Sequence, residues 1–188
     1  MSGDASAETP GPVTPVGVNH LVLNVTDLER SHRFWTEVMG FQQVGELDPK
    51  PDAKRPMEMR FYAGRGGNHH DLALMQIPGA TAVEADRWSM TASQPGLNHV
   101  AVEYGDRESW LAQIRSLQAA GVSFRSRINH GMSHSVYIQD PDGHGIEVIY
   151  TLPPEQWQGG VNEALNYLEV LPREGEEALA DPETPTFG

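Results

Sequence analysis

The chain has 188 residues, 38% of them hydrophobic, a length that suits one compact domain or two small ones sharing a core. It contains no cysteine, which excludes disulfides, zinc–thiolate sites and a cysteine nucleophile and leaves His, Asp and Glu as metal ligands. The net charge of −13 argues against a nucleic-acid partner, although ordinary solubility also explains it. No apolar run approaches a membrane span, and residues 1–15 lack the basic and apolar regions of a secretory signal, so we expect a cytoplasmic protein.

The first half of the chain predicts a strand, a helix and three further strands. Residues 1–15 are rich in Gly, Pro, Ser and Thr, and we expect a flexible tail there. Thr26 or Asp27 caps a helix in which Phe34, Trp35 and Val38 recur at helical spacing, and Gly40 ends it. Strands are predicted over 16–24, 41–47, 57–63 and 70–76. Residues 16–77 therefore form one βαβββ module.

The same order of elements begins again after a predicted linker, residues 78–95. The second module, residues 96–152, has a strand at 97–104, a helix at about 107–120, and strands at 122–126, 133–139 and 145–151. His20 and His99 lie 79 residues apart (99 minus 20), and the same offset carries Asp27 onto Asp106, the predicted cap of the second helix. Two matched pairs favour an internal repeat over two similar βα starts in an ordinary α+β domain.

The last part of the chain, residues 153–188, is predicted to form a C-terminal helix followed by an acidic tail. The helix is expected over 161–171, with Leu165, Leu168 and Leu171 along one side. Residues 173–188 are acidic and contain prolines, and we expect them to be mobile.

One histidine occupies the same place in two apolar runs, Val18-Asn19-His20-Leu21-Val22-Leu23 and Leu97-Asn98-His99-Val100-Ala101-Val102. Because side chains alternate along a strand, both histidines point to equivalent faces, and a metal ion would hold them together on a pseudo-twofold axis. Glu147, a carboxylate inside an apolar strand, offers the third ligand. Two histidines and one carboxylate leave open positions for substrate and oxygen, as in non-haem Fe(II) oxygenases. The alternative is that each is a hydrogen-bonded core histidine.

These features resemble the vicinal oxygen chelate (glyoxalase/bleomycin resistance/dioxygenase) superfamily over residues 16–151. The resemblance rests on the paired modules, the two Asn-His strand starts, and Asp140-Pro141-Asp142-Gly143 leading to Glu147. Within the superfamily, His69-His70-Asp71-Leu72-Ala73-Leu74 and Asn129 to Tyr137 resemble type I extradiol ring-cleaving dioxygenases. The resemblance implies an α+β fold in which two tandem βαββ(β) modules form one metal-centred, partly open β-barrel. Larger members carry four such modules, whereas this chain has a single pair.

The same resemblance implies a function and roles for individual residues. His20, His99 and Glu147 would bind Fe(II), or Mn(II), since the same ligands suit both ions. His70 would be the acid/base residue, Tyr137 would hydrogen-bond the substrate oxygen, and His130 would lie near the substrate. The expected activity is ring cleavage of an aromatic diol by O2 in aromatic compound catabolism. A homodimer or higher homo-oligomer is expected on base rates.

Other functions and simpler roles stay open at this point. A glyoxalase, epimerase or fosfomycin-resistance type of enzyme is one alternative, although Leu72-Ala73-Leu74 offers no carboxylate as a fourth ligand. A drug-binding resistance protein is another. His69 and His70 also suit a polar strand entrance, with His69 facing away from His70, and Tyr137 suits an ordinary strand aromatic. The remaining expectations place His144 in an exposed turn, His134 at the site entrance, and Trp35 and Trp110 on helix faces packed against the sheet.

Overall fold

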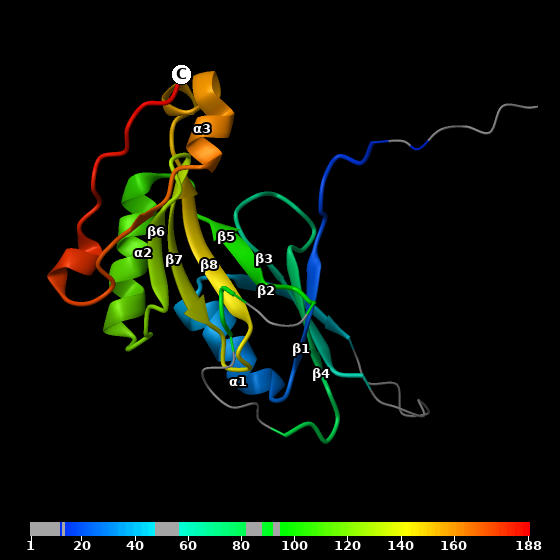
Figure 1. The fold of residues 1–188 in the computed structure, drawn as a ribbon. Coiled ribbons are helices and arrows are strands. Elements are labelled where there is room, and N and C mark those ends of the chain that lie inside the picture. The colour runs from blue at the N-terminus through cyan, green and yellow to red at the C-terminus, as the bar shows by residue number, and fades with distance from the viewer. Residues whose placement is uncertain (1–11, 13, 48–56, 82–87, 92–94) are drawn as a thin grey trace, which may run out of the picture.

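The computed structural model describes residues 12, 14–47, 57–81, 88–91 and 95–188. Its first sheet has the order β1-β4-β3-β2 and its second the order β5-β8-β7-β6-β9 (Figure 1). The helices and the two sheets confirm the predicted α+β class. No strand of one sheet pairs with a strand of the other among these residues, so the sheets do not close a barrel. The strands are β1 (Leu21–Val25), β2 (Gln42–Leu47), β3 (Met59–Ala63), β4 (Leu72–Gln76), β5 (His99–Glu103), β6 (Ser126–Asn129), β7 (Ser133–Gln139), β8 (Gly145–Thr151) and β9 (Glu169–Val170).

The helix of the first half begins at a side-chain cap and changes its winding midway. The carboxylate of Asp27 accepts a hydrogen bond of 2.9 Å from the backbone N–H of Arg30, which starts α1 (Leu28–Arg33). The helix continues as a π-helical turn, η1 (Phe34–Val38). The wider turn buries both Phe34 and Trp35, and Gly40, at a φ of 80°, lies just beyond its end.

The helix of the second half, α2 (Arg107–Ala119), is held on the second sheet by its apolar face. Asp106 caps it by accepting from the backbone N–H of Ser109 at 2.7 Å. Trp110, Ile114 and Leu117 recur at helical spacing and are fully buried, and the Trp110 indole N–H donates to the backbone oxygen of Val148 at 2.9 Å. This is the packing expected for Trp110, and it fixes α2 against β8.

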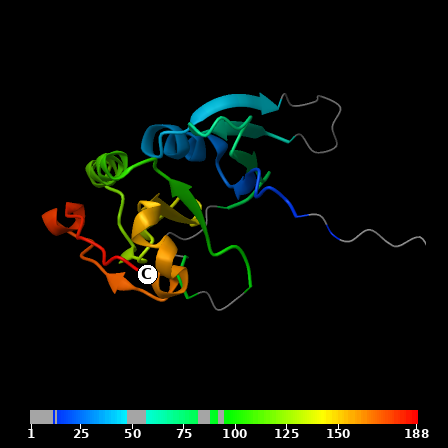
Figure 2. The ribbon, with the colours of Figure 1, turned by 90° about the horizontal axis from the view of Figure 1, so that it is seen from above.

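The two halves share one core, with α1 between the two sheets (Figures 1 and 2). The Tyr104 hydroxyl donates to the backbone oxygen of Met39 at 2.9 Å, and the Gln113 amide donates to that of Val38 at 2.8 Å. Arg30 pairs with Asp142 at 2.9 Å. In the described part of the chain, no helix has the length and apolarity needed to cross a membrane.

Two predicted elements in the second half of the chain have the wrong bounds. The strand expected at 122–126 begins only at Ser126, because Phe124 turns into the core instead of pairing. Helix α3 (Val161–Leu165) ends before Leu168, which is 60% exposed, and the chain then adds β9 to the edge of β6.

The acidic tail, expected to be mobile, packs instead along α2 (Figure 1). It forms a 3₁₀ turn, η4 (Glu176–Leu179), and then buries the carboxylate of Asp181 against His134. A buried charge held by partners gives this segment a defined position, which its composition alone does not reveal.

Candidate functional site

The parallel pairing of β5 with β8 brings His99 and Glu147 together. His99 lies opposite Gly145 and Ala101 lies opposite Glu147, so the two functional side chains are two positions apart on one face. Nε2 of His99 is 3.1 Å from Oε2 of Glu147, and the Glu147 residue is only 6% exposed. The sheet register thus places both second-module ligand candidates side by side.

The other oxygen of Glu147 is held by two hydroxyls from β7. Ser135 Oγ and Tyr137 Oη donate to Oε1 of Glu147 at 2.6 and 2.7 Å. Nε2 of His130 lies 3.0 Å from Tyr137 Oη. Because a carboxylate only accepts, the Tyr137 proton points to Glu147, and His130 therefore donates its Nε2–H to the tyrosine oxygen. The contacts link four polar side chains in a row, which we call the polar chain: His130, Tyr137, Glu147 and His99.

Burial sets the protonation of Tyr137 and His130. Burial, followed by the hydrogen bond to Glu147 and the charge of that carboxylate, raises the pKa of Tyr137. Burial also lowers the pKa of His130. At neutral pH the tyrosine therefore keeps its proton as a donor, and His130 is uncharged.

The donor atoms of His99 and Glu147 fit a cation. Nδ1 of His99 is 2.8 Å from the amide oxygen of Asn98, which leaves Nε2 directed at Glu147. Nε2 of His99 and Oε2 of Glu147 face each other at 3.1 Å, a separation that needs a positive charge between them, which either a proton on Nε2 or a bound metal ion supplies. A divalent ion with nitrogen and oxygen ligands satisfies this requirement.

The histidines of the first module gather at the other sheet. His20 precedes β1 and His70 precedes β4, and the pairing of Leu21 with Leu72 places these two strand starts side by side. The rings of His20 and His70 have centroids 4.5 Å apart, and Nδ1 of His69 is 2.6 Å from Nδ1 of His70. The expectation that His69 faces away from His70 is wrong, because both precede β4 and alternation holds only within a strand.

His20 and His69 are solvent-exposed and His70 is half-buried, whereas Glu147 is buried. Desolvation, followed by the charges of His69 and His20, lowers the pKa of His70, which favours its neutral form. Among the residues that the structure describes, no three His, Asp or Glu side chains are placed to hold one metal ion. His99 and Glu147 are therefore two of the three expected ligands, and His20 does not join them within this chain.

His134 and His144 differ from their expected surroundings. His134 was expected at the site entrance, but its side chain is 1% exposed and it contacts Asp181, because it alternates with Ser133 and Ser135 on β7. His144 was expected in an exposed turn. It is half-buried, and its Nδ1 lies 2.9 Å from the buried carboxylate of Asp140.

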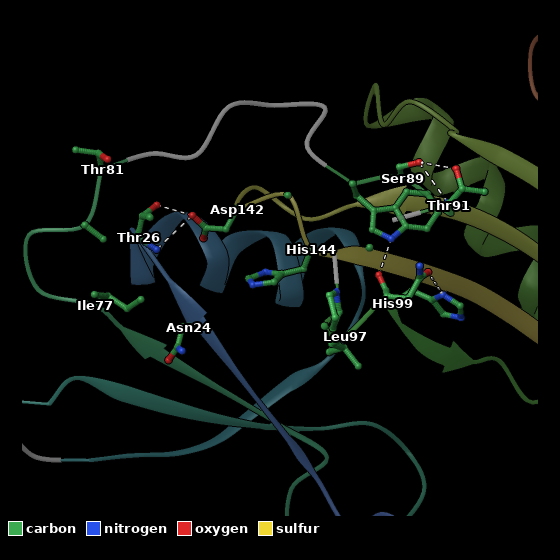
Figure 3. A pocket seen from close by; sticks show the side chains of 17 residues that line it. Asn24, Thr26, Ile77, Thr81, Ser89, Thr91, Leu97, His99, Asp142 and His144 are labelled. Carbon is green, nitrogen blue, oxygen red and sulfur yellow. Dashed lines mark hydrogen bonds between the residues drawn. The ribbon is translucent and has the colours of Figure 1, made fainter. Parts of the chain in front are cut away.

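A cavity of about 850 Å³ lies between the two modules, with His99 in its wall. Figure 3 shows His99 and Leu97 on one side, and Asn24, Thr26 and Asp142 on another, with His144 between them. Trp88 also lines the cavity and donates its indole N–H to the backbone oxygen of Asn98 at 2.5 Å. Such a hollow, lined by polar and apolar groups, suits a small molecule.

Trp88 is the residue of this region that sequence reasoning missed. Its ring is stacked on Tyr137, with centroids 5.7 Å apart and planes 11° from parallel. It sits against Gly145, where any larger side chain would collide with the indole. Nothing in the linker sequence marks Trp88, since its role follows from a contact with a strand 49 residues later (137 minus 88).

The sequence of this chain matches a model of a known protein family. Residues 17–148 match the model of the Glyoxalase/Bleomycin resistance protein/Dioxygenase superfamily. The chain belongs to this superfamily. Its match covers both modules and includes His20, His99 and Glu147.

Superfamily relatives with similar sequences carry the names of different enzymes. A catechol-2,3-dioxygenase of Bacillus subtilis is 28% identical over 145 residues, covering 75% of this chain and 44% of that protein. A lactoylglutathione lyase of Pseudomonas putida is 27% identical over 161 residues, covering 72% of this chain and 85% of that protein. The chain therefore spans less than half of the dioxygenase, and membership alone does not choose between these activities.

Solved structures of the superfamily share the fold. A glyoxylase/bleomycin resistance protein/dioxygenase domain from Frankia sp. EAN1pec has a TM-score of 0.59 at 19% identity, covering 74% of this chain and all of that domain. A mutant of the fosfomycin resistance protein FosX from Listeria monocytogenes, complexed with Mn(II), has a TM-score of 0.51 at 20% identity, covering 72% and 92%. At these identities the likeness concerns the fold only.

Proposed function

We propose that the protein is an Fe(II)-dependent extradiol dioxygenase that cleaves the ring of a catechol-like aromatic with O2, with Mn(II) as the alternative metal. The observation that supports it is the polar chain from His130 through Tyr137 and Glu147 to His99. A bound divalent ion supplies positive charge that lowers the pKa of a chelating diol hydroxyl. His99 and Glu147 would hold this ion together with His20.

The protein groups around the ion have separate tasks in this proposal. Ser135 and Tyr137 fix Oε1 of Glu147 and leave Oε2 for the metal. The Tyr137 hydroxyl, kept protonated by its raised pKa, directs its proton at Glu147, so its oxygen accepts a hydrogen bond from a substrate hydroxyl. Neutral His130 donates to the same tyrosine oxygen from behind. Trp88 covers one side of Tyr137 and excludes water from that face. His70 is the acid/base residue contributed by the first module.

The proposed metal site needs His20 beside His99 and Glu147. We propose that a homodimer brings His20 of one copy to His99 and Glu147 of the other. Within one chain His20 contacts His70 instead. Apolar side chains are partly exposed on the face of the first sheet that lies on the same side of the strands as His20. Val22 is 44% exposed and Leu47 is 40% exposed. Burying such a face against a second copy is favourable. In this assembly the first module of one copy completes the site of the other.

A lyase of the lactoylglutathione type is the second candidate, because such enzymes are similar in sequence to this chain. A site with four protein ligands needs a carboxylate from the first module. Strand β4 reads Leu72-Ala73-Leu74-Met75-Gln76, and the Gln76 amide oxygen already accepts from the backbone N–H of Leu28 at 2.9 Å. A strand without a carboxylate favours the dioxygenase, which keeps more positions open for diol and oxygen.

Oxygen uptake tests the proposal directly. Protein loaded anaerobically with Fe(II) is mixed with a panel of catechols in air-saturated buffer, and we expect oxygen consumption and a yellow ring-opened product. Glu147→Gln should abolish the reaction, and Glu163→Gln, at an exposed position of α3, should not. Iron-loaded protein that ignores every diol but forms lactoylglutathione from glutathione and methylglyoxal would establish the lyase instead. Tight drug binding by metal-free protein, without turnover, would indicate a sequestering protein.

A further inference from the structure

We propose that Asn98 and Asn19 are positioning residues that fix which ring nitrogen of His99 and His20 carries the proton. Each asparagine directly precedes its histidine and accepts from Nδ1, so that Nε2 is left as a bare lone pair for a metal ion. This inference rests on the proposed metal site and adds two residues that do not touch the ion.

The hydrogen bonds around Asn98 assign its amide and, through it, the His99 ring. One amide atom of Asn98 lies 3.1 Å from the backbone oxygen of Met90, which only accepts, so this atom is the nitrogen Nδ2. The amide oxygen therefore lies 2.8 Å from Nδ1 of His99, and Nδ1 must be the donor. The form of histidine that binds a metal is the neutral imidazole, which has one N–H, so in this form Nδ1 carries the proton and Nε2 carries none. That bare nitrogen is the atom aimed at Glu147.

An independent set of contacts gives the same result for His20. The amide nitrogen of Asn68 lies 2.7 Å from the backbone oxygen of Asn19 and 2.8 Å from that of His70, which fixes the Asn68 amide. Its oxygen accepts from Asn19 Nδ2 at 3.4 Å. The remaining Asn19 oxygen lies 2.7 Å from Nδ1 of His20, which is therefore protonated. Different neighbours thus orient the equivalent amide in each module.

A proton held on Nδ1 lowers the free-energy cost of binding a metal ion through Nε2. A histidine protonated at Nε2 would have to move its proton before it could bind the ion through that atom, whereas these histidines already present a lone pair. At Asn98 the arrangement also involves the linker, because Trp88 donates to the Asn98 backbone oxygen and Met90 accepts from its side chain. Trp88 therefore both lines the cavity and, together with Met90, holds Asn98 in place.

The test uses the metal-free full chain and Mn(II) alone, with no diol. Nitrogen-15 NMR of the histidine rings reports the tautomer, with His99→Gln used to assign the signal. We expect His99 of the wild type to be protonated at Nδ1, and Asn98→Leu to move a fraction of the population to Nε2–H. Titration with Mn(II) should show affinity reduced roughly 10–100-fold by Asn98→Leu.

Two further variants separate positioning from general damage to the structure. Asn98→Asp keeps an acceptor at the same place and should restore the Nδ1–H tautomer and most of the Mn(II) affinity. Asn162→Leu, at an exposed position of α3, should change neither. A wild-type His99 protonated at Nε2, or an Asn98→Leu variant with unchanged affinity, would overturn the inference.

The result of this test can be told apart from a failure of the proposed dioxygenase function. A chain with the expected tautomer and Mn(II) response that cleaves no diol retains the inference and refutes the dioxygenase. A wild-type chain that binds no divalent ion refutes both.

Discussion

The Tyr137 hydroxyl donates to Glu147 across neighbouring antiparallel strands, over 2.7 Å. This one contact links the candidate metal ligand to the group expected to contact substrate. Glu147 keeps a second donor in Ser135, so the tyrosine is removable without leaving Oε1 unpaired. The role of Tyr137 is therefore testable without disturbing the ligand.

Tyr137→Phe should slow ring cleavage and leave metal binding almost unchanged. Loss of one hydrogen bond to a charged group corresponds to about 1.5–3 kcal/mol, or roughly 10–100-fold in kcat with a diol. Steady-state kinetics measure this, and Mn(II) titration of the same variant is the control. Unchanged kcat would remove Tyr137 from the proposed mechanism.

A mixture of two inactive variants tests the shared site. His20→Ala and Glu147→Ala should each be inactive, because each removes one proposed ligand. If subunits exchange, random pairing should restore about a quarter of wild-type activity, since half the dimers are mixed and each carries one intact site. Oxygen uptake before and after mixing gives the result. No recovery, despite exchange seen by native mass spectrometry, would place all three ligands in one chain.

Gly145→Ala should displace Trp88 from Tyr137. A Cβ at Gly145 would overlap the indole ring of Trp88, and overpacking of this kind costs about 1–3 kcal/mol where neighbours cannot move. We expect changed Trp fluorescence and a raised KM for the diol. Gly105→Ala is the matched control, because a Cβ there meets nothing within 4 Å. Identical fluorescence in the two variants would contradict the stacked position of Trp88.

Asp181→Asn should destabilise the protein through the packed tail. The Asp181 carboxylate, 1% exposed, contacts His134 at 2.5 Å and Tyr150 at 2.9 Å, and also Arg107. Breaking a buried charged set by changing one partner typically costs about 3–5 kcal/mol. Urea unfolding at pH 7 measures the loss. A change below about 0.5 kcal/mol would mean that the tail contributes little to stability.

The same aspartate predicts a pH dependence of stability. Burial would raise the pKa of Asp181, but the hydrogen bonds and charge of His134, with those of Arg107 and Tyr150, outweigh burial and lower it below the ordinary 3.8. A lowered pKa in the folded state stabilises the protein above pH 3.8, and this contribution is lost as the pH falls through the folded-state value. The difference in unfolding free energy between wild type and Asp181→Asn should therefore shrink as the pH falls below about 4. A constant difference across that range would contradict it.

Local signals in the sequence were sufficient for several elements. Asp27 and Asp106 cap their helices as predicted, because capping requires only a side-chain oxygen next to the first turn. Strands β7 and β8 have the predicted bounds. The patterns failed where burial overrode them, as at Phe124, and they gave no sign of the π-helical turn in which the predicted core residues Phe34 and Trp35 lie.

The sequence by itself determined the α+β fold, the superfamily, and histidines at equivalent strand starts, because periodicity, caps and an offset of 79 residues are local or repeated properties. Only the tertiary structure decided that Trp88 covers Tyr137, that Asp181 anchors the tail, and that His20 lies with His70 while His99 lies with Glu147. Such contacts depend on how the two modules and the linker pack. Packing sums many weak interactions between residues far apart in the chain, and no pattern along it records them.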